Sequence, residues 1–128
     1  MKLFQTFVLL FSAIVLFTGC KKTYKTGDEF TLKFNKAAFI ELDGAKYEFK
    51  FAKLAEESRC PPDMQCVTEG QVVVKLQVNK VSTYSVGLGG NVTPFLEFAD
   101  HTIQLLEVTY DRGKYGKEKH YSVKLKVD

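Results

Sequence analysis

Hydrophobic and polar residues alternate along most of the chain after residue 26, with the period of two that marks half-buried β-strands. The clearest example is the segment 37–51, AAFIELDGAKYEFKF, in which Asp43-Gly44 is a two-residue type I′ hairpin signal. Pairing across this turn predicts one apolar face and one polar face. The opposed pairs are Leu42–Ala45, Ile40–Tyr47 and Ala38–Phe49 on the apolar face, and Glu41–Lys46 and Phe39–Glu48 on the other.

Similar alternation predicts further strands along the rest of the chain. They are Thr31–Phe34, Val72–Asn79, Thr83–Leu88, Pro94–Phe98, Thr102–Tyr110 and Tyr121–Val127. Within Thr102–Tyr110 the apolar parity changes at Leu106, which predicts a bulge or a strand that crosses between sheets. Sustained helical periodicity is missing, and only Lys53–Glu57 suggests a helical turn. Seven or eight short strands predict an all-β fold, an antiparallel sandwich of immunoglobulin-like or Greek-key type, with a small barrel as the alternative.

The N-terminal segment has a different pattern. Lys2 precedes an apolar run from Phe7 to Phe17 that only Ser12 interrupts. A transmembrane helix needs about 20 residues to cross the hydrocarbon, so this run is short for a permanent span. A basic start, a short apolar core and small residues at the end are typical of an export signal.

Phe17-Thr18-Gly19-Cys20, at the end of that signal, resembles the lipobox of bacterial lipoproteins, although the family prefers Leu where this chain has Phe17. The resemblance implies that the Cys20 thiol receives a diacylglyceryl group and that the signal is cut before Cys20. It divides the chain into a signal peptide (1–19), a lipidated tether (20–26) and a single β-sandwich domain (27–128). The alternatives are an ordinary signal whose cysteine sits in the fold, and an uncleaved N-terminal anchor.

Acylation of Cys20 would make the membrane the first partner of the domain. Each buried CH₂ contributes about 0.8 kcal/mol, and two or three chains hold a protein on a bilayer essentially permanently. In the lipoprotein family, Asp directly after the cysteine favours the inner membrane. Lys21 stands there instead, so the resemblance implies an outer-membrane lipoprotein that faces the periplasm.

The charge balance limits the other partners. The chain has 18 Lys and Arg against 15 Asp and Glu, a formal net charge of +3, and removal of the signal takes away only Lys2. Such a small, dispersed charge gives no footprint for nucleic acid. We expect a monomer with an envelope protein as its further partner.

Cys60 and Cys66 remain once Cys20 is assigned to lipid, and an even pair in an exported chain predicts a disulfide. Pro61-Pro62-Asp63 between them is strong turn chemistry, which brings the ends of the loop together. A metal site is the alternative, but it needs more ligands nearby, and His101 and His120 are distant in sequence. We therefore expect no metal and no cofactor.

The segment 57–70, ESRCPPDMQCVTEG, resembles a motif of small secreted or lipid-anchored bacterial proteins: Asp-Ser-Arg-Cys-Pro, then Cys-x-Trp-x-Gly before a hydrophobic strand. This chain departs from it at Glu57 and Thr68. The resemblance supports the disulfide and the β fold and implies no activity.

Arg59, which has acidic residues on both sides, either presents a recognition surface or ties the loop to the sheet beneath it. The partner-binding loop predicted from these residues comprises Arg59, Pro61, Pro62, Asp63 and Met64. Asp111–Lys117 is predicted to be a flexible hairpin tip.

The sequence offers no polar cluster around a nucleophile, so we expect no enzymatic activity and no catalytic residue. We expect a lipid-anchored binding or envelope-structural module. A small-ligand-binding barrel and a protease inhibitor that presents the Cys60–Cys66 loop are the alternatives.

Overall fold

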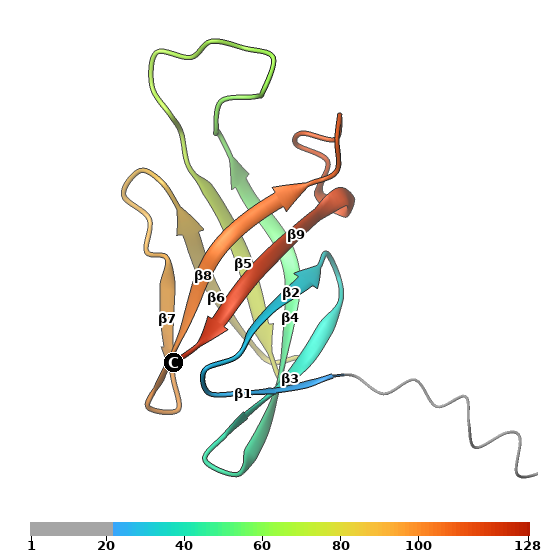
Figure 1. The fold of residues 1–128 in the computed structure, drawn as a ribbon, viewed down its shortest axis with the longest axis vertical. Coiled ribbons are helices and arrows are strands. Elements are labelled where there is room, and N and C mark those ends of the chain that lie inside the picture. Colours follow the sequence, from blue (N-terminus) through green and yellow to red (C-terminus); the bar gives the residue numbers. More distant parts are fainter. Residues whose placement is uncertain (1–21) are drawn as a thin grey trace, which may run out of the picture.

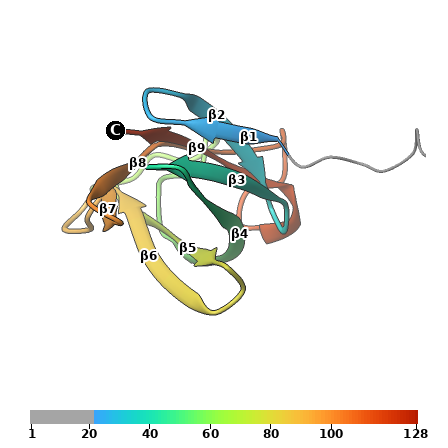
Figure 2. The ribbon, with the colours of Figure 1, turned by 90° about the horizontal axis from the view of Figure 1, so that it is seen from below.

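The computed structural model describes residues 22–128, which form a sandwich of two β-sheets (Figures 1 and 2). The strands are β1 (Thr23–Lys25), β2 (Glu29–Lys33), β3 (Ala37–Leu42), β4 (Ala45–Glu57), β5 (Val72–Val78), β6 (Ser82–Leu88), β7 (Phe95–Phe98), β8 (His101–Tyr110) and β9 (Tyr121–Val127), and a short 3₁₀ helix, η2 (Glu118–His120), precedes β9. The predicted all-β sandwich is confirmed. The predicted signal peptide and Cys20 lie outside the described residues.

The two sheets have simple strand orders. One sheet runs β1-β3-β4-β5-β6 and the other β2-β9-β8-β7. β3 to β6 form a meander, and so do β7 to β9. β2 is separated from β7 in sequence by β3 to β6 and lies antiparallel beside β9, which gives the four-stranded sheet the strand order of a Greek key. Within residues 22–128 the sheets stay separate, with β1 and β6 at the edges of one and β2 and β7 at the edges of the other. The described domain is therefore an open sandwich and not the small barrel named as the alternative.

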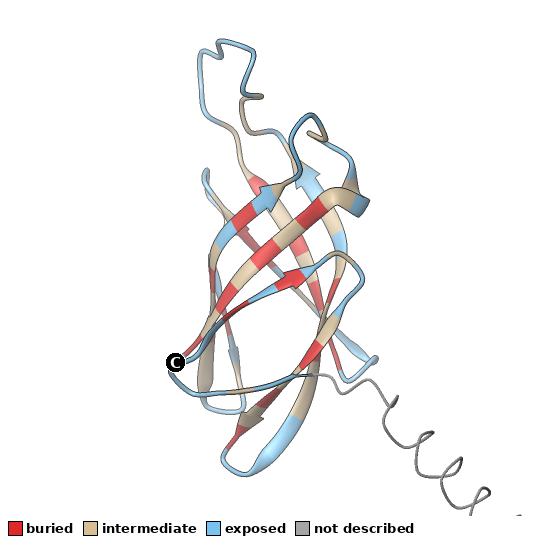
Figure 3. Ribbon diagram, turned by 45° about the vertical axis from the view of Figure 1, so that its right-hand side comes forward, coloured by how far each residue is buried: buried red, intermediate tan, exposed pale blue. Residues whose placement is uncertain are grey.

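Apolar side chains fill the space between the sheets. Buried positions alternate along the strands, most regularly in β5 and β9, where every second residue is buried (Figure 3). The largest fully buried side chains include Phe49, Phe51, Leu76, Ile103, Leu125 and Tyr121. Full burial of one such side chain stabilises the fold by roughly 1.5–3 kcal/mol, so this core is the main source of stability.

The predicted hairpin is confirmed in every pair of its register, from Leu42 opposite Ala45 to Ala38 opposite Phe49. Its turn residues, Asp43 and Gly44, have φ of 52° and 85°, as a type I′ turn requires. Turn chemistry and the hydrophobic pattern specify the same register here, which is why the sequence was sufficient.

Two predictions on the same sheet are wrong. Lys53–Glu57 is not a helical turn, because β4 continues through these residues, with register shifts between Phe51 and Lys53 and between Leu54 and Glu56. These irregularities break the alternation that a regular strand would show. Thr23–Lys25, assigned to the tether, forms β1, a parallel edge strand beside β3. The folded domain therefore begins before residue 27, and residues 22–128 contain nine strands.

The bulge predicted in the strand after His101 is confirmed. The pairing of β8 with β9 shifts between Leu105 and Glu107, so that both Leu105 and Val108 are buried. The extra residue, Leu106, moves the second half of β8 onto the opposite parity.

Candidate functional site

A disulfide-closed loop projects from one end of the sandwich, between β4 and β5 (Figure 1, top). Cys60 and Cys66 are bonded, with their Cα atoms 5.8 Å apart, which confirms the predicted disulfide. The loop is open to solvent: Met64, inside the disulfide ring, is 61 % exposed, and Val67, directly after the ring, is fully exposed. The covalent bridge limits the conformations of this exposed segment.

The base of the loop is joined across its two ends by Ser58 and Gln71. The amide of Ser58 donates to the carbonyl of Gln71 at 2.9 Å, and the amide of Gln71 donates back to Ser58 Oγ at 3.0 Å. Gly70 lies so close to this junction that a Cβ there would overlap the carbonyl oxygen of Ser58. The glycine of the motif is therefore required by the close approach of two backbones.

Glu57 and Arg59 form a bidentate ion pair beneath the loop. Arg59 Nε donates to Glu57 Oε1 at 2.8 Å, and Arg59 Nη2 donates to Glu57 Oε2 at 2.6 Å. The remaining guanidinium nitrogen, Nη1, donates to the carbonyl of Val108 on β8 at 2.8 Å. Only 5 % of the Glu57 side chain is exposed, so most of this pair is shielded from water. Of the two predicted roles for Arg59, its contacts match the one that ties the loop to the sheet.

Tyr121 extends this network at the start of β9. Its hydroxyl donates to Glu57 Oε2 at 2.8 Å and accepts a hydrogen bond from the amide of Gly116 at 2.8 Å. Burial raises the pKa of Tyr121 to about 12, so the hydroxyl keeps its proton. Burial also raises the pKa of the Glu57 carboxyl, but hydrogen bonds from Arg59 and Tyr121 together outweigh it, and the pKa lies below its ordinary value. Hydrogen bonding to Glu57 raises the pKa of Arg59, and both groups of the pair stay charged.

A second loop, residues 111–117 between β8 and η2, is joined to the first by aromatic side chains. The Tyr115 hydroxyl donates to the carbonyl of Arg59 at 2.5 Å. The Arg59 guanidinium lies 5.8 Å from the centre of the Tyr110 ring, which packs against Tyr115 and Tyr121. The predicted hairpin tip is therefore tied to the disulfide loop through Tyr115.

An open cleft of about 400 Å³ lies between these two loops. Its lining residues are Pro62, Asp63, Tyr110, Arg112, Gly113 and Tyr115. Of the predicted partner-binding residues, Pro62 and Asp63 line this cleft, and Arg59 contacts its lining residues Tyr110 and Tyr115. Pro61 is half-buried and Met64 is exposed, and neither lines the cleft. This lining combines the rings of Tyr110 and Tyr115 with the negatively charged Asp63 and the positively charged Arg112. Such a surface can bind a partner that carries both apolar and charged groups.

The three tyrosines of this end were missed by sequence reasoning. Tyr121 gave one signal that was overlooked: it occupies the first inward position of an otherwise aliphatic strand, and a buried tyrosine hydroxyl needs a partner. Tyr110 and Tyr115 gave no such signal, because the fold alone brings them together.

The histidines lie at opposite ends of β8. His101, at its start, contacts Asp43 Oδ2 and the carbonyl of Asp128, both at 3.1 Å. His120 contacts Asp111 at 3.1 Å beyond the other end. Among residues 22–128, no three His, Cys, Asp or Glu side chains group as metal ligands would.

Comparison of the chain with models of known families, with curated proteins and with solved structures finds no match. In the part of the chain that the structure describes, no helix has both the length and the apolar character to span a membrane.

Proposed function

We propose that this protein is a lipid-anchored binding module of the bacterial cell envelope. Acylated Cys20 holds the domain on a membrane. We expect this to be the outer membrane, with the domain facing the periplasm. The two loops at the disulfide end recognise an envelope protein. Because β1 begins at Thr23, three peptide steps separate the Cα atom of Cys20 from that of the first strand residue, a reach of at most about 11 Å. Lipidation would thus hold the sandwich close to the bilayer surface.

The observation that carries the binding role is the way the exposed loop is held. A disulfide closes it, a shielded ion pair fixes its base, and Tyr115 joins it to the neighbouring loop. A loop fixed in one conformation before it meets a partner loses less entropy on binding, so affinity rises. A loop with only a structural role would not need so much exposed apolar surface at Met64 and Val67.

The chemistry of the cleft favours a protein segment as the partner. Tyrosine and arginine dominate the energetics of protein interfaces, and the cleft contributes Tyr110, Tyr115 and Arg112. The interior of the sandwich is filled by the apolar core, which favours this partner over a ligand held inside a barrel.

Site-specific photo-crosslinking in living cells tests the proposal. p-Benzoylphenylalanine replaces Met64 in the disulfide loop and, as the control, Val81, an apolar residue that is 84 % exposed beyond the opposite end of β5. We expect a discrete protein adduct from position 64 and none from position 81. The combined variant Cys60→Ser/Cys66→Ser should reduce that adduct.

Adducts of the same pattern at both positions, or none at position 64, would refute recognition by this loop. A protease as the position-64 partner, inhibited by the purified protein, would favour the inhibitor alternative.

A further inference from the structure

The outer face of the five-stranded sheet carries an excess of positive charge. Its outward lysines are Lys25, Lys46, Lys50, Lys53, Lys75 and Lys80, and its outward acids are Glu41, Glu48 and Glu56. The outer face of the four-stranded sheet is balanced instead, with Lys33, Lys124 and Lys126 against Glu29, Glu97 and Glu107. Lys124 there lies 3.6 Å from Glu29 and Lys126 lies 3.7 Å from Asp128. The molecule therefore has one basic face and one neutral face.

Two of the lysines on the basic face stand directly opposite each other. Lys53 on β4 pairs in register with Lys75 on β5. Like charges in opposed positions of an antiparallel pair destabilise the sheet, and an anionic partner over the face removes that cost.

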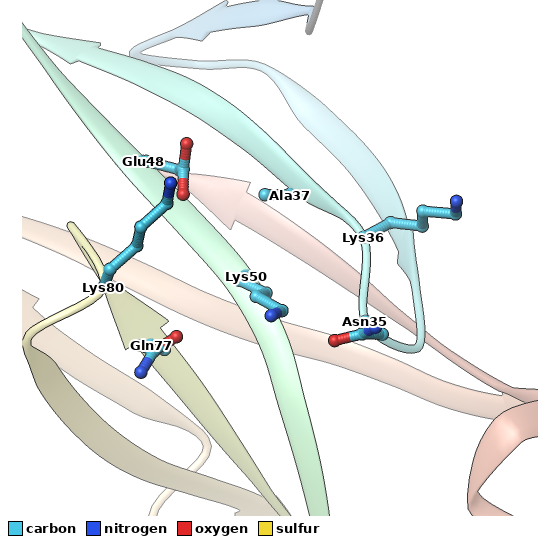
Figure 4. A pocket seen from close by; sticks show the side chains of 7 residues that line it. All are labelled: Asn35, Lys36, Ala37, Glu48, Lys50, Gln77 and Lys80. Atoms are coloured by element: carbon cyan, nitrogen blue, oxygen red, sulfur yellow. The ribbon is translucent and has the colours of Figure 1, made fainter.

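The basic face also contains a depression of about 480 Å³ (Figure 4). Lys36, Lys50, Lys80 and Glu48 line it together with the side-chain amides of Asn35 and Gln77. The Lys80 side chain points toward Glu48, and the Lys36 side chain points away from the other lining residues (Figure 4). The Lys50 ammonium and the side-chain amides of Asn35 and Gln77 are the donors that this depression offers to the phosphate of a lipid headgroup.

The start of the described chain lies beside this face. Lys22 and Lys36 line one shallow groove, and Lys36 also lines the depression, so basic surface runs from Lys22 to Lys80. The carbonyl of Lys22 accepts a hydrogen bond of 3.0 Å from the amide of Phe39 at the centre of β3. Cys20 precedes Lys22 by two residues, so an acyl chain on Cys20 would enter the membrane next to the basic face.

We propose that the outer face of the five-stranded sheet lies on the membrane and binds anionic phospholipid headgroups. This inference rests on the proposed acylation of Cys20. Each lysine near an anionic bilayer adds to the attraction, and the effect falls off within a Debye length, about 8 Å at physiological salt. The strands then run along the bilayer surface, and the disulfide loop, at the end of β4, is presented sideways along the membrane.

Quenching of a fluorophore by a headgroup-attached quencher tests this orientation in the full acylated protein. Two matched glutamines carry the label: Gln77→Cys in the depression of the basic face and Gln104→Cys on the neutral face, between Phe95 and Lys126. The protein is reconstituted in vesicles of equal parts phosphatidylcholine and phosphatidylglycerol, and in vesicles of phosphatidylcholine alone. We expect strong quenching at position 77 and weak quenching at position 104, with the difference confined to the anionic vesicles.

A charge-matched pair of variants sharpens the test. Lys50→Gln/Lys80→Gln should lower, by roughly thirtyfold, the ratio of molecules whose basic face lies on the membrane to molecules in other orientations. Lys124→Gln/Lys126→Gln should leave this ratio unchanged. Equal quenching at the two positions in protein that floats with the vesicles would overturn the orientation alone. Protein that carries no acyl group and does not float would overturn the proposed function, and this inference with it.

Discussion

Glu57 and Arg59, separated by one residue, form a two-pronged ion pair with contacts of 2.8 and 2.6 Å at the point where β4 becomes the disulfide loop. The pair closes a tight turn of backbone, because the amide of Arg59 also donates to Glu57 Oε1 at 3.1 Å. Through Val108 and Tyr121 it reaches both β8 and β9. One carboxylate thus connects the loop to the opposite sheet.

Glu57→Gln should destabilise the domain by about 2 kcal/mol. The variant keeps the volume but leaves the Arg59 charge without its counter-ion. The cost stays below that of a fully buried broken pair because 23 % of the Arg59 side chain is exposed to water. Urea unfolding measures the effect. Glu97→Gln, an exposed site on β7, is the control and should change stability by less than about 0.5 kcal/mol. Equal effects at the two positions would contradict the role of the pair.

The same carboxylate predicts a dependence of stability on pH. The pKa of Glu57 is lower in the folded state than its ordinary value of about 4.5, so the unfolded state binds more protons as the pH falls. Its contribution is complete above the ordinary pKa and is lost as the pH drops through the lower folded pKa. Unfolding free energies of wild type and Glu57→Gln should therefore converge below pH 4.5. A difference that stays constant down to pH 3 would show that Glu57 is not the group that titrates.

Loss of the disulfide should loosen the loop and leave the sandwich intact. For Cys60→Ser/Cys66→Ser, the chain-entropy estimate for a seven-residue ring gives a loss of about 2.4 kcal/mol. The core lies between the sheets and does not include the loop, so the far-ultraviolet circular dichroism spectrum should remain that of a β protein. Met64→Ala, in the same loop, should change stability little. A double variant that fails to fold would mean that the loop is part of the folding core.

Gly70→Ala should destabilise the domain by about 2 kcal/mol, because the added methyl group would overlap the Ser58 carbonyl and force the loop ends apart. Thr68→Ala, an exposed change two residues earlier, serves as the control. Hydrogen exchange should report faster exchange of the Ser58 and Gln71 amides in Gly70→Ala only. Unchanged protection of those amides would show that the backbone junction tolerates a side chain.

The sequence predicted the fold where local signals agreed. The hairpin around Asp43-Gly44 was right in every pair, and the parity change at Leu106 correctly located the bulge in β8. In both places the side-chain pattern itself carries the information, since a shift of one residue moves apolar groups to the wrong face.

Prediction failed where the determining contacts are distant in sequence. β1 has three residues and forms by parallel pairing with β3, which no local pattern announces. The shifts in β4 made Lys53–Glu57 look helical. At the site, the turn chemistry and cysteine count predicted the disulfide, but Tyr115 meets Arg59 across 56 positions and was invisible from the sequence.

The proposed anchor through acylated Cys20 can be checked by mass spectrometry of the protein extracted from bacterial membranes, which detects the acyl chains themselves. We expect a mature protein that begins at Cys20, carries two or three acyl chains and retains the Cys60–Cys66 disulfide. A mature protein with a free Cys20 thiol, or one that keeps residues 1–19, would contradict it.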